Sequence, residues 1–268
     1  MIEHLRPGVT ASGARVVLFD FDGTLSTIRS GWVEIMVPMM VEILADLKTG
    51  EPAADLREIV LEFVGRLTGK ETIYQMMALA DEITKRGGTP EDPKVYKKMY
   101  LDALMERIKD RLEGLESGRT LPEEWLVPGS RALLEGLKAR GLKLYLASGT
   151  DHANVVEEAK LLQVYDYFDG GVFGALDDLK AFSKAILVKQ IVDSAEHKGE
   201  EFLAFGDGYV EVQVVKEVGG VAVGVASDEP ACERVDDWKR NRLASVGADW
   251  IVPHYRDTAL LMRTLFPE

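Results

Sequence analysis

The sequence predicts an α/β fold: a Rossmann-like parallel sheet core with helices on both faces, plus an all-helical domain inserted after the first strand. Two observations support this class. Short, nearly continuous apolar runs recur along the chain, as expected for strands that are buried on both faces of a parallel sheet. A long segment near the N-terminal end instead carries its apolar residues at helical spacing.

Five apolar runs are the predicted strands. The first precedes Asp20, and the other four lie in the second half of the chain, where helical patterns separate them. This alternation of strand and helix is typical of a parallel sheet with crossover helices. The predicted strands are residues 16–19, 142–147, 201–205, 221–225 and 250–252.

The predicted inserted domain shows four stripes of apolar residues at helical spacing and no convincing strand. Such stripes are the buried faces of helices that pack against one another. The sequence therefore predicts three parts: an N-terminal tail over 1–14, a helical domain over 28–125, and an α/β domain formed by 15–27 together with 126–268.

Composition narrows the function. The chain has 268 residues and a net charge of −13, so it offers no basic surface for nucleic acid. Its single cysteine, Cys232, excludes an internal disulfide, and no Cys/His cluster is present for zinc. The N-terminal residues lack the apolar core of a signal peptide, and no apolar segment is long enough to cross a membrane. We expect a cytoplasmic protein without a membrane partner; the oligomeric state is not predicted.

Carboxylates follow two of the predicted strands. Asp20 and Asp22 come directly after the first strand, and Asp207 and Glu211 follow the strand that ends at residue 205. Ligands bind at the carboxyl ends of strands in open α/β sheets. Four carboxylates gathered there would repel one another without a counter-ion, and Mg²⁺ suits a site that also holds a phosphate. The residue pattern therefore predicts a magnesium site.

Two further segments offer groups that bind phosphate. Ser148 lies between a predicted strand and a helix, where its hydroxyl and free backbone N–H groups would form an anion site. The alternative is that Ser148 and Thr150 only cap the helix. Lys184, at the start of a later helix with Ser183 as its cap, could neutralise phosphate charge, although Lys180 competes for this role.

These residues resemble the four motifs of the haloacid dehalogenase-like (HAD) hydrolases, in order and at similar spacing. The inserted helical domain resembles the C1-type cap of phosphoglycolate phosphatase-like members. Two departures are the absence of a proline after the lysine of the third motif and a glutamate where the fourth motif more often ends in aspartate. The residues that carry the resemblance are Asp20, Asp22, Ser148, Lys184, Asp207 and Glu211.

The resemblance implies a phosphatase that hydrolyses a small phosphorylated metabolite through an aspartyl-phosphate intermediate. Asp20 would attack phosphorus, and Asp22 would protonate the leaving oxygen and then activate water. Asp20, the carbonyl of Asp22 and Asp207 would hold Mg²⁺. Ser148 and Lys184 would bind the phosphoryl oxygens. Glu211 would orient Lys184 or a metal-bound water.

Three residues are predicted to contact the substrate: Thr24, Gly149 and Lys70. Lys70 lies in a loop between two helical stripes, in which Thr68 and Glu71 have the spacing of a capping box. A lysine is unfavourable at the positive end of a helix. We therefore expect this loop to reach over the core and to present Lys70 to an acidic or polyhydroxyl leaving group.

Other functions stay open at this point. A sugar phosphomutase of the β-phosphoglucomutase type would use the same residues, whereas a dehalogenase would not need the acid at Asp22. From another class, a phospho-receiver signalling domain also combines clustered acids with a hydroxyl and a lysine, but it lacks an inserted domain. A nucleotide-binding domain is disfavoured because Glu211 stands where the dinucleotide fingerprint requires a third glycine.

Overall fold

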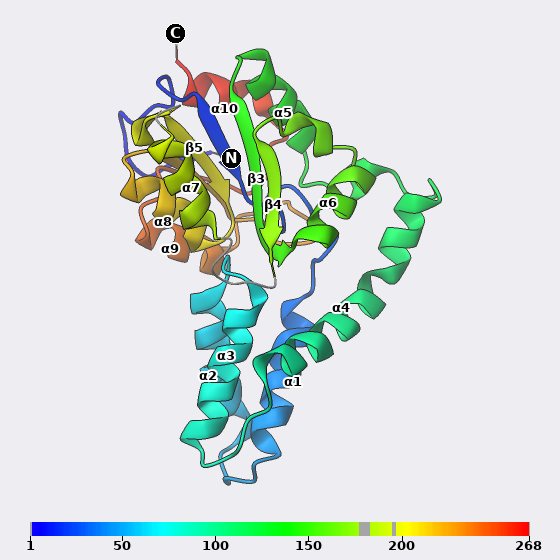
Figure 1. Ribbon diagram of the computed structural model, residues 1–268. Coiled ribbons are helices and arrows are strands. Elements are labelled where there is room, and N and C mark those ends of the chain that lie inside the picture. The colour runs from blue at the N-terminus through cyan, green and yellow to red at the C-terminus, as the bar shows by residue number, and fades with distance from the viewer. Residues whose placement is uncertain (1, 177–182, 195–196, 268) are drawn as a thin grey trace.

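The computed structural model describes residues 2–176, 183–194 and 197–267, and within them it shows a seven-stranded sheet flanked by helices (Figure 1). The strand order is β1-β7-β6-β5-β2-β3-β4. The edge strand β1 is antiparallel to β7, and every other neighbouring pair is parallel, which confirms the predicted fold class. The strands are β1 (Glu3–His4), β2 (Val16–Phe19), β3 (Lys143–Asp151), β4 (Gly171–Ala175), β5 (Phe202–Gly206), β6 (Val221–Val225) and β7 (Trp250–Val252).

The sheet differs from the sequence prediction at its two edges. The predicted tail over 1–14 contributes β1, because Glu3 and His4 pair with Ile251 and Trp250. At the other edge, β4 was not predicted, since two of its five residues are glycine and glycine is depleted in strands. Edge strands bury less apolar surface than central ones, so their sequence signal is weaker.

Helices cover both faces of the sheet, and alternate residues of each strand point to opposite faces. Val17 and Phe19 of β2 pack with helices α5, α6 and α10, whereas Val16 and Leu18 pack with α7, α8 and α9. Burial on both faces explains why the strands read as continuous apolar runs. The helices are α5 (Ser130–Ala139), α6 (His152–Leu161), α7 (Lys184–Asp193), α8 (Tyr209–Glu217), α9 (Asp237–Ser245) and α10 (Thr258–Leu265).

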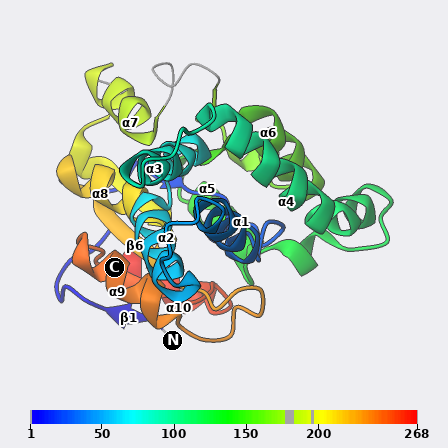
Figure 2. The same ribbon diagram turned by 90° about the horizontal axis from the view of Figure 1, so that it is seen from below.

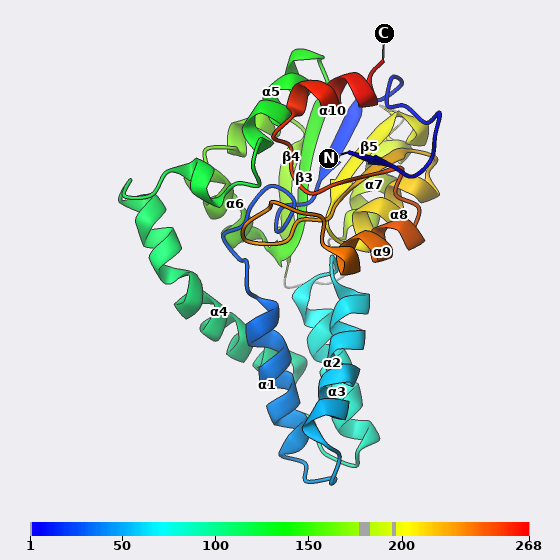
Figure 3. The same ribbon diagram turned by 180° about the vertical axis from the view of Figure 1, so that it is seen from behind.

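Four further helices lie together at the carboxyl ends of the parallel strands, as Figures 1 and 3 show. We call them the cap helices. They fall within the segment for which the sequence predicted a helical domain. No helix in the described part of the chain is both long and apolar enough to span a bilayer. The cap helices are α1 (Val33–Ala45), α2 (Ala53–Leu67), α3 (Thr72–Lys85) and α4 (Pro93–Glu116).

Two segments of chain connect the cap helices to the sheet, and they run side by side. The backbone N–H of Thr27 donates to the carbonyl of Trp125 at 2.8 Å, and that of Val127 donates to Leu25 at 2.9 Å. The Nη1 of Arg111, on α4, also donates to the carbonyl of Ile28 at 2.5 Å. The connection is therefore a paired ribbon and not two independent linkers.

Candidate active site

Asp20 and Asp22 lie at the carboxyl end of β2, in the centre of the sheet. The N–H of Asp20 donates to the carbonyl of Phe205 at 2.9 Å, which extends the pairing of β2 with β5, and its side chain is buried. The next turn depends on Gly23, whose φ is +72°. A methyl group there would lie 2.2 Å from Oδ2 of Asp207, so only glycine lets these two loops approach.

Lys184 connects two of the buried acids. Its ammonium donates to Oδ1 of Asp20 at 2.8 Å and also contacts Oε1 of Glu211. Lys184 opens α7, where Ser183 accepts a hydrogen bond from the N–H of Ile186, as a helix cap does. The competing Lys180 lies outside the described residues.

The charges of this cluster perturb one another. Burial alone would lower the pKa of Lys184, but the carboxylates of Asp20 and Glu211 outweigh it and raise that pKa. Burial raises the pKa of Asp20 well above its usual value; Lys184 opposes the shift, whereas the negative charges of Glu211 and Asp207 add to it. The site therefore favours a further positive charge near Asp20.

Two hydroxyl groups orient Asp22. Ser148 and Thr150 both donate to its Oδ2, at 3.2 and 2.9 Å. Helix α6 begins after Asp151, so the alternative in which Ser148 and Thr150 only cap this helix is wrong. The other oxygen of Asp22, Oδ1, is buried and has no hydrogen-bond partner among the described residues. That leaves a buried oxygen available to another group.

Thr24 has a different role from the predicted one. Its side chain is fully buried, and its hydroxyl accepts a hydrogen bond from the N–H of Asp207 at 2.9 Å. Its carbonyl accepts one from the hydroxyl of Tyr255, also at 2.9 Å. Thr24 therefore fixes the loop that carries Asp207, and the prediction that it contacts substrate is wrong.

The sequence missed a buried ion pair beside Asp22. Arg29 donates from Nε and Nη2 to Oε1 of Glu158, at 3.0 and 2.6 Å, and both side chains are buried. The Nε of Arg29 also lies 3.9 Å from Oδ1 of Asp22. The partners are 129 residues apart, so no local pattern connects them. An arginine within an otherwise uncharged segment was the only available signal.

A second missed pair lies beside Asp207. The ammonium of Lys239, on α9, is 3.0 Å from Oδ2 of Asp207 and contacts Oε1 of Glu229. Burial alone would lower the pKa of Lys239, but the two carboxylates outweigh it and raise that pKa. Burial in turn raises the pKa of Glu229. The sequence around both residues is rich in charges, so no local pattern distinguishes the buried Lys239 from a solvated lysine.

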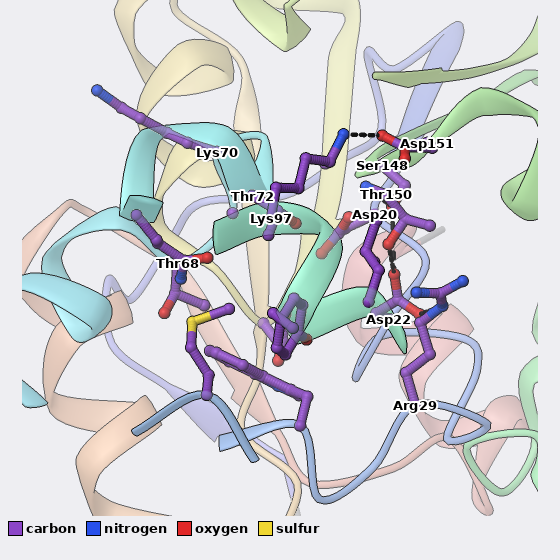
Figure 4. Close-up of a pocket in the computed structure, with 18 residues that line it drawn as sticks. Asp20, Asp22, Arg29, Thr68, Lys70, Thr72, Lys97, Ser148, Thr150 and Asp151 are labelled. Atoms are coloured by element: carbon purple, nitrogen blue, oxygen red, sulfur yellow. Dashed lines mark hydrogen bonds and ion pairs between the residues drawn. The ribbon is translucent and has the colours of Figure 1, made fainter. Parts of the chain in front are cut away.

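A cavity of about 90 Å³ separates the acids from the cap helices (Figure 4). Asp20, Asp22, Ser148 and Gly149 form part of its wall from the sheet side. The cap helices and the residues directly next to their ends contribute both polar and apolar side chains, namely Trp32, Met36, Thr68, Thr72, Gln75, Lys97, Tyr100 and Leu101. The structure thus brings Asp20, Asp22, Ser148 and Asp207 to one cavity, whereas Lys184 lines a neighbouring pocket that shares Ser148 and Gly149 with it.

The loop before α3 reaches this cavity, as expected. A methyl group at Gly149 would lie 2.4 Å from the carbonyl oxygen of Lys70, so the loop touches the sheet domain through its backbone. The side chain of Lys70 is exposed and points away from Asp20 in Figure 4, and its ammonium lies 5.7 Å from the ring centre of Tyr74.

The predicted capping box in this loop is wrong. The hydroxyl of Thr68 donates backwards to the carbonyl of Val64 at 2.9 Å, and the side chain of Glu71, although at the N-cap of α3, bonds to no helix N–H among the described residues. Glu71 is buried instead, and its Oε1 has no partner within the described chain. The contact of this loop with the sheet domain has overridden the local capping pattern.

The donors near Asp20 fit a hard divalent cation. Across residues 2–176, 183–194 and 197–267, no group of three or more His, Cys, Asp and Glu side chains is arranged to hold a metal. The predicted site needs only two, Asp20 and Asp207, together with the backbone carbonyl of Asp22. Glycine at position 23 leaves room for the carboxylate of Asp207 against this backbone, and oxygen donors of this kind suit Mg²⁺.

The family model of the haloacid dehalogenase-like hydrolases matches residues 14–219. The chain belongs to this family. Membership in a hydrolase family favours an enzyme over the phospho-receiver and nucleotide-binding alternatives. Both Glu229 and Lys239 lie beyond the matched residues. No curated protein sequence matches the chain.

Solved structures of HAD proteins share the fold of this chain at low sequence identity. A predicted phosphoglycolate phosphatase from Haemophilus somnus has a TM-score of 0.58 at 16% identity, covering 93% of this chain and 98% of its own. A β-phosphoglucomutase from Clostridium difficile reaches 0.54 at 15%, covering 87% and 98%. A HAD family hydrolase from Deinococcus radiodurans, with bound phosphate and sodium, reaches 0.53 at 14%, covering 94% and 97%.

Proposed function

We propose that this HAD hydrolase is a Mg²⁺-dependent phosphatase that acts on small phosphorylated metabolites through a phosphorylated Asp20. The observation that carries this proposal is the placement of Asp20. Its carboxylate is buried, bonded to Lys184 at 2.8 Å, and faces a cavity that Asp22 also lines. A nucleophile and an acid therefore line one cavity, and a cation that can neutralise phosphate contacts the nucleophile directly from a neighbouring pocket that shares Ser148 and Gly149 with it.

The reaction divides into two steps. In the first, Asp20 attacks phosphorus, the bond from phosphorus to the leaving oxygen breaks, and Asp22 gives that oxygen a proton. In the second, Asp22 takes a proton from water as the water attacks phosphorus, which releases phosphate and restores Asp20. The hydroxyls of Ser148 and Thr150 hold Oδ2 of Asp22, so its acidic group keeps a fixed direction in both steps.

The phosphoryl oxygens need positive charge and hydrogen-bond donors. Lys184 supplies the charge, and Ser148 and the backbone N–H of Gly149 lie on the same wall. Mg²⁺ bound by Asp20, Asp207 and the carbonyl of Asp22 would neutralise charge shared by nucleophile and phosphate. The Deinococcus radiodurans HAD hydrolase has bound phosphate and sodium, which supports the binding of both an anion and a cation by a protein of this fold.

The size of the cavity supports a small leaving group. Its volume is about 90 Å³, well below the roughly 300–1,000 Å³ that is typical of sites for drug-sized ligands. A larger substrate would require the cap helices to move away. Trp32, Met36 and Tyr100 form an apolar part of the wall, so water is displaced when the leaving group enters.

Hydrolysis of p-nitrophenyl phosphate tests the proposal. We expect turnover with Mg²⁺, loss of turnover in excess chelator, and at least a ~1000-fold loss of kcat for Asp20→Asn, which removes the nucleophile. Asp81→Asn, an exposed acid on α3, is the matched control and should keep the wild-type rate. Undiminished turnover in chelator, or in Asp20→Asn, would contradict the proposal. Isomerisation of a sugar phosphate without release of phosphate would instead identify a mutase.

A further inference from the structure

We infer that Lys239 and Glu229 form a pair of opposite charges that sets the affinity of Asp207 for Mg²⁺. Lys239 competes with the metal for Asp207, and Glu229 holds Lys239 when the metal displaces it. The inference rests on the proposed function, because it takes Asp207 to be a metal ligand. It concerns two positioning residues that lie beyond the residues matched by the family model.

The geometry puts three charges in direct contact. The ammonium of Lys239 lies 3.0 Å from Oδ2 of Asp207 and touches Oε1 of Glu229. The exposed fractions of these side chains are 15%, 11% and 14%, so water screens the charges little. A methyl group at Gly23 would lie 2.8 Å from Oε1 of Glu229, which places Glu229 against the same turn that carries the Asp22 carbonyl.

A lysine in this position has two consequences. Its positive charge occupies the oxygen of Asp207 that a cation would use, and therefore weakens cation binding. A buried ammonium without a partner would be costly, however, so it cannot simply be pushed away. Glu229 removes this cost because it already contacts Lys239, which can transfer its remaining hydrogen bonds to Glu229 when Asp207 turns to the metal.

Helix α9 keeps the lysine in place. The Nη2 of Arg242 donates to the carbonyl of Gly65 on cap helix α2, and a methyl group at Gly65 would lie 2.8 Å from Cζ2 of Trp238. Figure 2 shows α9 close to α2. Because α9 is held against a cap helix through Trp238 and Arg242, which lie near Lys239 on the same helix, the ammonium has a defined position beside Asp207.

Mg²⁺ titration followed by calorimetry tests the inference without measuring activity. Lys239→Met removes the competing charge and should lower the Kd for Mg²⁺ about tenfold. Glu229→Gln leaves the lysine to act on Asp207 alone and should raise the Kd about tenfold. Each such shift corresponds to about 1.4 kcal/mol. The double variant should return to within about threefold of the wild-type Kd.

Shifts of opposite sign are the decisive result. If the pair served only to hold the loop in shape, both single variants would weaken binding, and that outcome would overturn the inference. Lys216→Met is the matched control, because Lys216 forms a similar pair with the fully buried Asp249 at 2.9 Å. Asp249 precedes β7 and so lies at the amino end of that strand, whereas Asp207 follows β5 and lies at the carboxyl ends of the parallel strands. This control should lower stability and leave the Kd unchanged.

Two further measurements keep the outcomes separate. Asp207→Asn should abolish binding; if it does not, or if the wild-type protein binds no Mg²⁺, the proposed metal site fails and the inference falls with it. If Lys239→Met does not fold, the double variant is compared with Glu229→Gln, from which it differs only at Lys239. Tighter binding by the double variant supports competition, whereas equal or weaker binding overturns it.

Discussion

The ammonium of Lys97 lies 2.5 Å from Oδ1 of Asp151, so an ion pair joins cap helix α4 to the end of β3 beside the cavity. The two side chains are mostly shielded, with exposed fractions of 21% and 35%. Both residues line the cavity, and Figure 4 shows the pair directly above Ser148. It therefore helps to hold α4 against the sheet domain.

Lys97→Met should loosen this closure. We expect kcat/KM to fall about three- to tenfold, since a partly exposed ion pair contributes about 1 kcal/mol. The rate should fall because closure of the cap helices excludes water from the phosphorylated aspartate. Solution scattering should show a more extended molecule, because the variant lacks the ion pair that joins α4 to β3. The paired linkers at Thr27 and Val127 are where we expect the chain to bend.

Lys98→Met is the control for this prediction. Lys98 is the next residue of α4, and it pairs with Asp102 of the same helix at 2.6 Å. Its loss should leave both kcat/KM and the scattering curve unchanged. An identical curve for Lys97→Met and the wild-type protein would mean that the ion pair does not hold the cap helices.

Gly149→Ala should impair turnover far more than stability. The added methyl group would lie 2.4 Å from the carbonyl oxygen of Lys70, a backbone atom that cannot rotate away. The cap loop must then lift from the sheet domain, and we expect at least a ~100-fold loss of kcat/KM. Gly136→Ala, within α5 and with no atom closer than 3.6 Å, should be neutral or slightly stabilising. Equal activity of the two variants would show that the loop contact is dispensable.

Lys70→Ala tests the earlier prediction that this side chain selects the leaving group. Because the ammonium points away from Asp20 towards Tyr74, we expect kcat/KM to change less than about threefold for both p-nitrophenyl phosphate and the true substrate. Ranking phosphorylated metabolites by kcat/KM would supply that substrate. A selective loss on the metabolite alone would restore Lys70 to the role that the sequence predicted.

Mg²⁺ binding should weaken as the pH falls. Burial raises the pKa of Asp20, so its carboxyl keeps a proton at a higher pH than an exposed aspartate, and a metal must displace that proton. We expect the Kd for Mg²⁺ to rise as the pH is lowered, with proton release detected by titration in two buffers of different ionisation enthalpy. Asp20→Asn should release no proton. A pH-independent Kd would show that Asp20 is already ionised in the free protein.

Much of the site could be predicted from the sequence because it depends on short segments. Asp20 and Asp22 come directly after an apolar strand. Ser148 could be found in the same way from the apolar run before it, and Lys184 from the helix that it opens. Parallel strands in one sheet bring their carboxyl ends together, so residues far apart in the chain meet without any further information. The helical periods of the cap segment likewise identified its helices.

The tertiary structure decided the contacts that local pattern does not encode. Lys239, on a helix near the C-terminal end, contacts Asp207. Arg29 pairs with Glu158, which is 129 residues away in the sequence. The buried hydroxyl of Thr24 bonds to the loop that carries Asp207. Periodicity determines which face of an element is buried, because burying apolar area is favourable whichever apolar surface covers it. Which charge meets which, and where the Lys70 side chain points, depends on how the loops pack, since buried charges need specific partners at short range.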